Sequence, residues 1–222
     1  ISACLVGSEM CIRDRLVVGM SPIQAALYIL PLPLAAFVAG PLAGWLLAYM
    51  PGPRLMFLAL TVSGLGMGGY LLSYDGSFMA QMASLTVLGI GIGATMTAAS
   101  SSIMQSATPE RAGMAASIEE VSYELGGALG VTLMGSILTG VYAQTLDVPA
   151  GVTQAGTVRD SLDDALLVAE GLPTDLAAAL TQVAKSAFDT GYAVVIATAT
   201  VMLLATAVFV LLNRTRRPAQ AA

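Results

Sequence analysis

The sequence predicts an all-α protein that crosses a membrane several times. Of its 222 residues, 56% are hydrophobic and 10% are charged, and the mean hydropathy is +0.80. Soluble domains carry about 25% charged residues. Five stretches are long and apolar enough for a transmembrane helix, which needs about 20 residues. We therefore expect about five membrane helices and a helical hairpin outside the membrane.

The first fifteen residues fit neither a signal peptide nor a helix start, because the order of basic, apolar and small residues is missing. Residues 5–15 match one reading frame of a transposase sequencing adapter, residue for residue. We expect 1–15 to be a sequencing artefact and the natural chain to begin near Leu16. The alternative is a natural N-terminal tail, and unrelated codons in the source DNA would support it. Cys4 and Cys11 form no metal or disulfide pattern.

The predicted membrane helices have recognisable start signals. The first, 22–50, begins with an N-cap and a proline, Ser21-Pro22, and its further prolines suggest kinks. The fourth, 109–142, begins with the same pair of signals. The second, third and fifth cover 54–73, 78–106 and 190–212.

Basic residues predict the orientation of these helices. If the helices alternate in direction, and the predicted adapter residues 1–15 are set aside, Arg54, Arg111 and the three arginines after the last helix lie on one side, and only Arg159 and Lys185 lie on the other. We therefore expect a cytoplasmic C-terminus. The expected organisation is four membrane helices in 16–142, an outer loop in 143–189, a last membrane helix in 190–213 and a cytoplasmic tail in 214–222.

The outer loop contains two amphipathic stretches. Residues 157–169 and 173–188 place apolar side chains at helical spacing. The sequence Gly171-Leu172-Pro173 between them is a helix stop followed by a helix start. This hairpin is either a packed cap or a lid over an outer vestibule.

Three carboxylates lie within the fourth apolar segment: Glu119, Glu120 and Glu124. A charged side chain at the bilayer centre costs about 2.5–3.5 kcal/mol, so such residues usually face a wet cavity, take up protons or meet a cation. Glu120 and Glu124 are about 40° apart around a helix, and Glu119 lies off this stripe. Two carboxylates this close in a low dielectric can hold a proton and release it when a cation arrives.

Small and polar residues complete the predicted proton and cation site. Tyr123 lies on the same side of the helix and can offer its hydroxyl or its ring to a ligand. Ser117 and Gly127 lie above and below. The alternative is that the acids only lock helix contacts. In the third segment, the hydroxyl run that begins at Thr95 faces either substrate or a neighbouring helix, and its cavity candidates are Met96 and Gln105.

Three glycines in the third segment, Gly89, Gly91 and Gly93, predict close helix packing. The chain has no His, which is the commonest metal ligand and general base. Neither a nucleophile–base pair nor a metal-ligand set is visible. We expect no enzyme activity, no metal, no cofactor and no nucleic-acid partner.

Three stretches carry a family resemblance: 16–22 with Leu30-Pro31, Gly40-Pro-Leu-Ala-Gly44 with Gly52-Pro-Arg54, and 109–113 with 119–127. Together they resemble the major facilitator superfamily, and within it the last five helices of a fourteen-spanning drug:proton antiporter of the quaternary-ammonium and methyl-viologen exporter branch. The resemblance covers 16–222. The second stretch is similar to the cytoplasmic loop motif of the superfamily, formed here by Gly40, Gly44, Gly52 and Arg54.

The resemblance implies a C-terminal fragment of a proton-coupled multidrug exporter in a bacterial inner membrane. It implies alternating access, export of lipophilic cations, roles for Glu119, Glu120 and Glu124, and N-terminal helices of the same chain as partners. Two departures are Gly44, where the full loop motif has Asp, and 34–37, where some members carry a carboxylate. Two rival functions stay open: a major facilitator carrier for another small substrate, and a non-transport membrane subunit with five helices.

Overall fold

The computed structural model describes residues 13, 16–17, 19–74 and 76–214. Every regular element in these ranges is a helix, and five helices are long and apolar enough to cross a membrane, which confirms the expected all-α membrane fold. Of the predicted adapter segment 1–15, all residues except Arg13 lie outside the described residues. The chain forms two compact units, 1–26 with 127–196 and 27–126 with 197–222.

The first membrane segment is formed by two helices, α2 (Pro22–Ile29) and α3 (Pro31–Leu46), where a single helix 22–50 was expected. The interruption falls at Leu30, because neither Pro31 nor Pro33 has an N–H to donate to the preceding turn. Leu30 keeps helical backbone angles, so the two helices still form one span of 25 residues.

The predicted cap at the start of α2 is confirmed. Ser21 Oγ accepts a hydrogen bond from the backbone N–H of Gln24 at 3.3 Å, and Gln24 Oε1 accepts one from the N–H of Ser21 at 3.0 Å. Because each side chain satisfies a backbone donor of the other residue, the pair forms a capping box.

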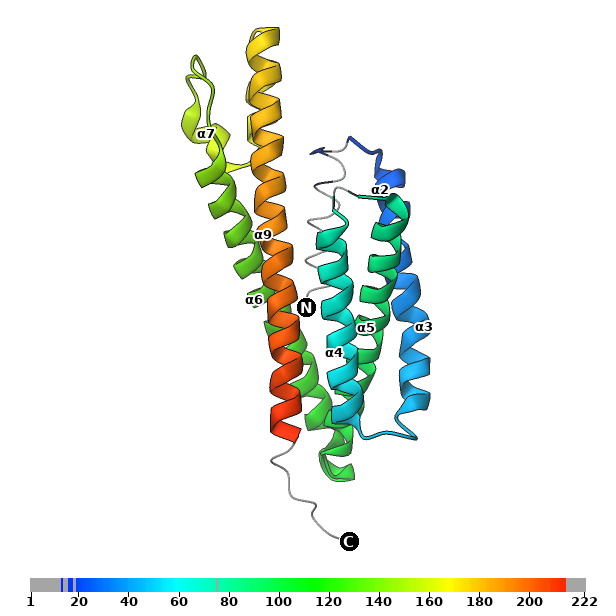
Figure 1. Cartoon of the computed structure of the whole chain (residues 1–222). Coiled ribbons are helices and arrows are strands. Elements are labelled where there is room, and N and C mark those ends of the chain that lie inside the picture. Colours follow the sequence, from blue (N-terminus) through cyan, green and yellow to red (C-terminus); the bar gives the residue numbers. More distant parts are fainter. Residues whose placement is uncertain (1–12, 14–15, 18, 75, 215–222) are drawn as a thin grey trace. The chain divides into compact units, whose positions relative to one another are not determined.

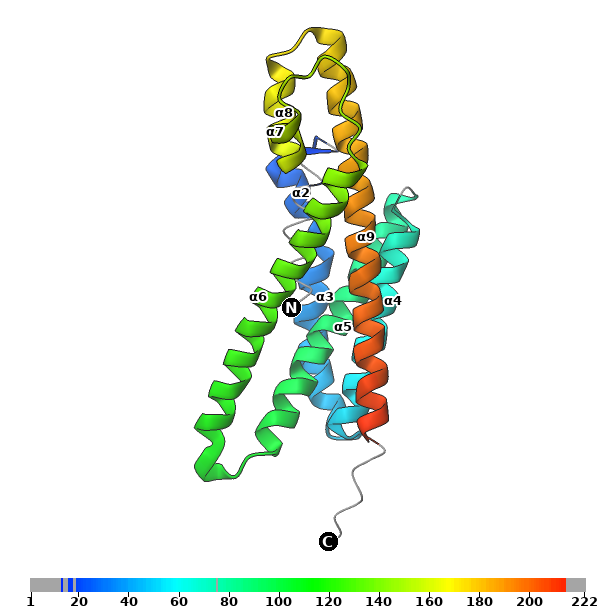
Figure 2. The same cartoon turned by 90° about the vertical axis from the view of Figure 1, so that its left-hand side faces the viewer.

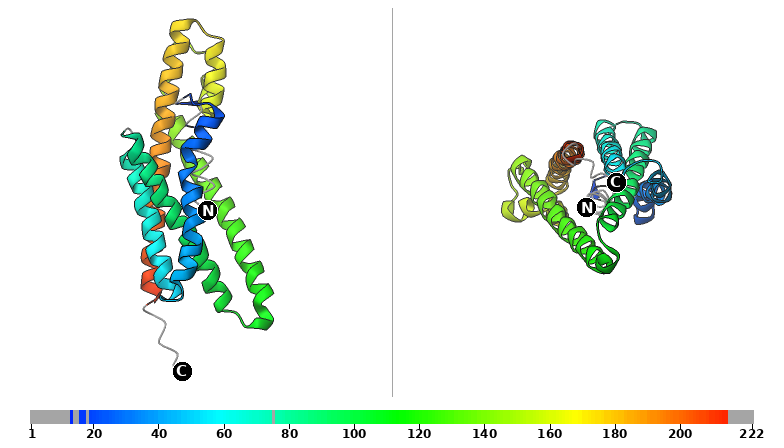
Figure 3. Two further views of the ribbon diagram at one scale, coloured as in Figure 1. Left: turned by 90° about the vertical axis from the view of Figure 1, so that its right-hand side faces the viewer. Right: turned by 90° about the horizontal axis from the view of Figure 1, so that it is seen from below.

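The core of the 27–126 and 197–222 unit is a three-helix group: α3, α4 (Gly52–Leu72) and α5 (Phe78–Gln105). In Figure 1 and in the view from below in Figure 3, α5 lies beside both α3 and α4. A Cβ atom on Gly89 would meet the backbone of Leu32, and one on Gly93 would meet the backbone of Ala36. A Cβ atom on Gly91 would instead meet Ser63 and the carbonyl oxygen of Ala59, both in α4. The predicted packing role of these glycines is therefore confirmed.

The other unit contains the second half of α6 (Ala112–Thr145), α7 (Ala155–Asp160), α8 (Leu162–Glu170) and the first half of α9 (Thr174–Arg214). A 3-10 turn, η1 (Pro109–Arg111), precedes α6. The helix α9 is uninterrupted, so the second hairpin helix and the last membrane helix are one element. No proline follows Thr174 before residue 214, and Gly191 sits where the helix approaches Leu138 of α6.

The hairpin of 155–188 is tightly packed, a property that a cap and a lid would share. Its first helix is divided at Ser161, whose extended backbone ends α7 and whose Oγ caps α8 by accepting from the N–H of Asp164. In Figure 2, α8 runs alongside the start of α9. The apolar faces are buried, with Val158, Leu162, Ala165, Leu180 and Ala184 at 0–3% exposure.

Tyr142 links α6 to this hairpin. Its hydroxyl donates to the carbonyl oxygen of Val158 at 3.0 Å and to that of Ser161 at 3.2 Å. The ring is 2% exposed. A buried phenol usually finds a partner for its hydroxyl, and here the two carbonyls come from the junction between α7 and α8.

Candidate functional site

The three carboxylates lie in the first half of α6. Alanine, methionine, leucine and glutamate are strong helix formers, and they are frequent from Ala112 onward. Since α6 is a continuous helix, Glu120 and Glu124 lie one turn apart on one face, about 5–6 Å apart at Cβ. The predicted juxtaposition of these two residues is confirmed at the level of the helix.

The carboxylate face is open in the described chain. Glu120 and Glu124 are exposed, and Glu119, which lies off the stripe, is half-buried. A Cβ atom placed on Gly113 or Gly127 would meet no atom within 4 Å. The stripe therefore combines acidic side chains with clear space above and below them.

The described part of the chain places no cation on these acids. No ion pair joins Glu119, Glu120 or Glu124 to any Arg or Lys of the described ranges. In the same ranges, Tyr123 is 41% exposed and donates no hydrogen bond to them. Ser117 donates to the carbonyl of Gly113 at 3.0 Å.

The two cavity candidates on α5 are not joined to the carboxylates. Met96 is 50% exposed, and the side-chain amide of Gln105 donates to Ser101 Oγ at 2.7 Å. Most hydroxyls near the end of α5 donate to the carbonyl one turn earlier in their own helix. The hydroxyl of Thr97 also contacts α3, where it donates a hydrogen bond to the carbonyl oxygen of Gly40 at 3.3 Å. The hydroxyls of this run therefore form their hydrogen bonds mainly with backbone carbonyls of their own helix.

The loop-motif residues pack the α3–α4 connection against α5. A Cβ atom on Gly40 would lie 3.6 Å from Thr97 Oγ1, and one on Gly52 would lie 2.5 Å from Ser102 Oγ. A side chain at Gly52 would therefore displace Ser102. Arg54 is exposed in the first turn of α4. The glycines of the motif thus have a packing role, and its arginine forms no ion pair within the part of the chain that the structure describes.

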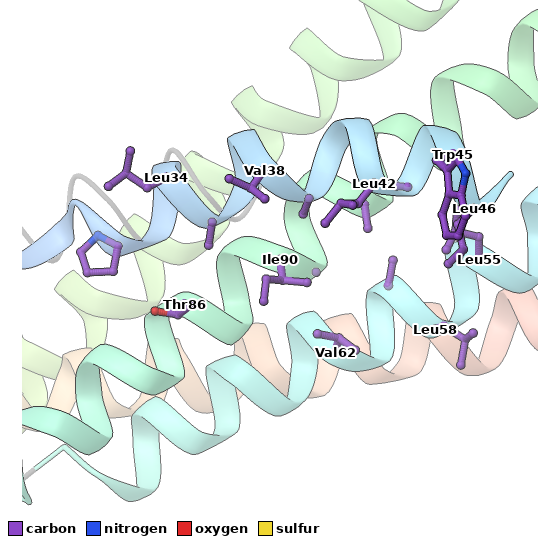
Figure 4. Close-up of a pocket in the computed structure, with 17 residues that line it drawn as sticks. Leu34, Val38, Leu42, Trp45, Leu46, Leu55, Leu58, Val62, Thr86 and Ile90 are labelled. Atoms are coloured by element: carbon purple, nitrogen blue, oxygen red, sulfur yellow. The ribbon is translucent and has the colours of Figure 1, made fainter.

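An apolar groove between α3, α4 and α5 was not predicted from the sequence. It has a volume of about 820 Å³. Figure 4 shows α3 and α4 as its two walls, with Trp45, Leu46 and Leu55 at one end and Leu34 and Thr86 toward the other. Its lining is apolar except for the indole N–H of Trp45 and for Thr86, whose hydroxyl donates to the carbonyl of Met82 at 2.8 Å. The groove therefore offers a ligand almost no hydrogen bonds.

No metal-binding group is found among the residues that the structure describes, where no three His, Cys, Asp or Glu side chains gather.

Comparison with curated proteins finds resistance and export proteins. The chain is 31% identical over 214 residues to the methyl viologen resistance protein SmvA of Salmonella typhimurium. This match covers 92% of this chain and 42% of that protein. It is 33% identical over 199 residues to the multidrug efflux pump LfrA of Mycolicibacterium smegmatis, covering 88% and 40%. A tetracenomycin C resistance and export protein of Streptomyces glaucescens is 25% identical over 211 residues, covering 90% and 39%.

The chain thus spans about two fifths of the length of the curated relatives that it matches. No family model matches it. The relatives are named for resistance and export, and none is named for an enzymatic reaction, which agrees with the expectation that this chain is not an enzyme.

Proposed function

Because the chain is homologous to drug efflux transporters of the major facilitator superfamily, we propose that it forms part of a proton-coupled exporter of lipophilic and quaternary cations. Transport proceeds by alternating access. The protein lies in a bacterial inner membrane with its C-terminus in the cytoplasm, which the distribution of Arg54, Arg111 and the C-terminal arginines supports.

The carboxylate stripe of α6 carries the proposal. Glu120 and Glu124 lie one turn apart on a helix long enough to cross the membrane, with contact-free glycines on either side. An acid pair in a membrane either binds protons or neutralises a cation. In the proposed cycle, Glu120 and Glu124 exchange protons for the cation, Tyr123 contributes its ring, and Glu119 is a secondary acid.

The test replaces Glu120 by Gln in the exporter that carries this segment, because glutamine keeps the size of the side chain and removes its charge. Inverted membrane vesicles are acidified by respiration, and tetraphenylphosphonium is then added. We expect the wild-type vesicles to release protons when the cation is added. In Glu120→Gln and Glu124→Gln, we expect the rate of this proton release to fall at least about tenfold, as is typical when an essential proton-transfer group is removed.

The matched control is Glu110→Gln. Glu110 lies in the turn that precedes α6, outside the stripe, and is exposed. This variant keeps wild-type flux if the stripe is the coupling site. Normal flux in Glu120→Gln, at wild-type protein levels in the membrane, contradicts the proposal. Equal losses in all three variants would indicate a general effect of acid removal rather than a site.

A further inference from the structure

The groove between α3, α4 and α5 is open along its length. Its wall residues are far from buried: Leu34, Val38, Leu42 and Leu58 are 47–59% exposed, and Trp45 is 62% exposed. All three helices are segments that can cross a membrane. An open apolar groove along membrane-crossing helices is a surface on which a hydrocarbon chain can lie.

One end of the groove carries a positive charge. Arg54 lies one helical turn before Leu58, and Val62 follows one turn later, so Arg54 continues the α4 wall of the groove beyond its apolar part. Arg54 is exposed and forms no ion pair with the described residues. In 22–105 it is the sole basic residue, and the sole acidic residue is Asp75, in the connection between α4 and α5.

Two aromatic residues lie at the same end of the groove. Trp45 and Tyr49 make an edge contact with ring centroids 4.9 Å apart, and they are 62% and 72% exposed. Such amphipathic rings gather where a membrane meets water. Within the described ranges, neither the indole N–H nor the phenol hydroxyl has a hydrogen-bond partner. This end therefore combines a cation with two polar groups, a combination that is typical of helix ends at the level of lipid headgroups.

From this arrangement we infer that the groove binds an anionic phospholipid. The acyl chain lies between α3 and α4, and the headgroup phosphate pairs with Arg54 beside Trp45. The charge decides between this ligand and the cationic cargo proposed above, because Arg54 repels a cation and the groove contains no carboxylate. The inference depends on the membrane location of these helices and is independent of the coupling role of Glu120.

Trp45 is the only tryptophan of the chain, so its fluorescence reports on the groove without labelling. The purified 222-residue chain is placed in phosphatidylcholine vesicles that contain a small fraction of lipid with brominated acyl chains, which quench tryptophan on contact. The brominated lipid is either phosphatidylglycerol or phosphatidylcholine. We expect the anionic lipid to associate about fivefold more strongly, since a basic residue near an anionic headgroup contributes about 1 kcal/mol.

Variants of Arg54 assign the preference to the groove. Arg54→Gln should reduce the fivefold preference to parity, and Arg54→Lys should retain it. Arg111→Gln is the matched control, because Arg111 is a second exposed arginine just before α6 and does not line the groove. In the wild type, 1 M NaCl should also remove the preference, because it shortens the screening length to about 3 Å.

Three results would overturn the inference. Equal quenching by the two brominated lipids, or a preference that survives both Arg54→Gln and high salt, would show that Arg54 selects no lipid. Absence of quenching by either lipid would mean that a second copy of the chain or another polypeptide covers the groove. Relief of quenching by tetraphenylphosphonium, to the same extent in the wild type and in Arg54→Gln, would mark a site for cargo.

Discussion

Gly93 provides a sharp test of how α3 and α5 fit together. A methyl group in place of its hydrogen would lie 2.9 Å from both the carbonyl carbon and the Cα of Ala36, and nearer still to the carbonyl oxygen. Non-bonded carbons attract one another at about 3.5–4.0 Å. The three nearest atoms all belong to the backbone of Ala36, so the rotation of a side chain cannot relieve this contact. Gly93→Ala therefore has to push the two helices apart by about 1 Å.

The cost of this displacement follows from the packing. A gap of about 1 Å forfeits up to about half of the dispersion energy of the atoms that line it. Overpacking of this kind costs about 1–3 kcal/mol. For a chain of this size, each kcal/mol lowers the melting temperature by about 2–4 °C. We expect Gly93→Ala to melt about 2–12 °C below the wild type when the purified chain is heated in detergent and followed by far-UV circular dichroism.

Gly127→Ala is the matched control, because the same substitution in α6 meets no atom within 4 Å. Alanine in a helix interior is favoured over glycine by about 0.5–1 kcal/mol, so this variant should melt about 1–4 °C higher. A Gly93→Ala variant that melts at or above the wild-type temperature would refute the close approach of α3 and α5.

Two further predictions concern hydrogen bonds. Tyr142→Phe leaves the carbonyls of Val158 and Ser161 without their shared donor, which lowers the stability of the folded chain by about 1–3 kcal/mol. Amide hydrogen exchange should therefore accelerate in α7 and α8. The control variant Tyr123→Phe, at an exposed position, should leave the exchange rates of α7 and α8 unchanged. Unchanged exchange would exclude a latch at Tyr142. Gln81→Leu removes the amide that donates to two carbonyls of the α4–α5 connection, each at 3.0 Å, so proteolysis at this connection should accelerate while α7 and α8 keep their exchange rates.

The positions of the membrane helices could be predicted from the sequence, because apolar length and helix caps are local properties. The capped start at Ser21 and the stop before Pro173 both agree with the structure. Three boundaries differ. The α2–α3 interruption lies before Pro31 and Pro33, where kinks within one helix were expected. The break at Ser161 depends on which backbone donors find partners in three dimensions. The helix α9 runs unbroken through 174–214, where a hairpin helix and a separate membrane helix were expected.

The candidate site was predictable only in part. Helical spacing was sufficient to pair Glu120 with Glu124, because one helix carries both. It could not predict that Gln105 would bond within α5. The groove was missed for a different reason: residues that face lipid and residues that face another helix are equally apolar in a membrane protein. The available signal was Trp45, Tyr49 and Arg54 gathered at one end of two helices.

The backbone contacts of the α5 glycines have a mechanical consequence. Packed interfaces are bistable rather than continuously deformable, so helices that touch through their backbones cannot slide past each other by small steps. Gly89 and Gly93 hold α5 on α3, and Gly91 holds it on α4, so these three helices move as a single block.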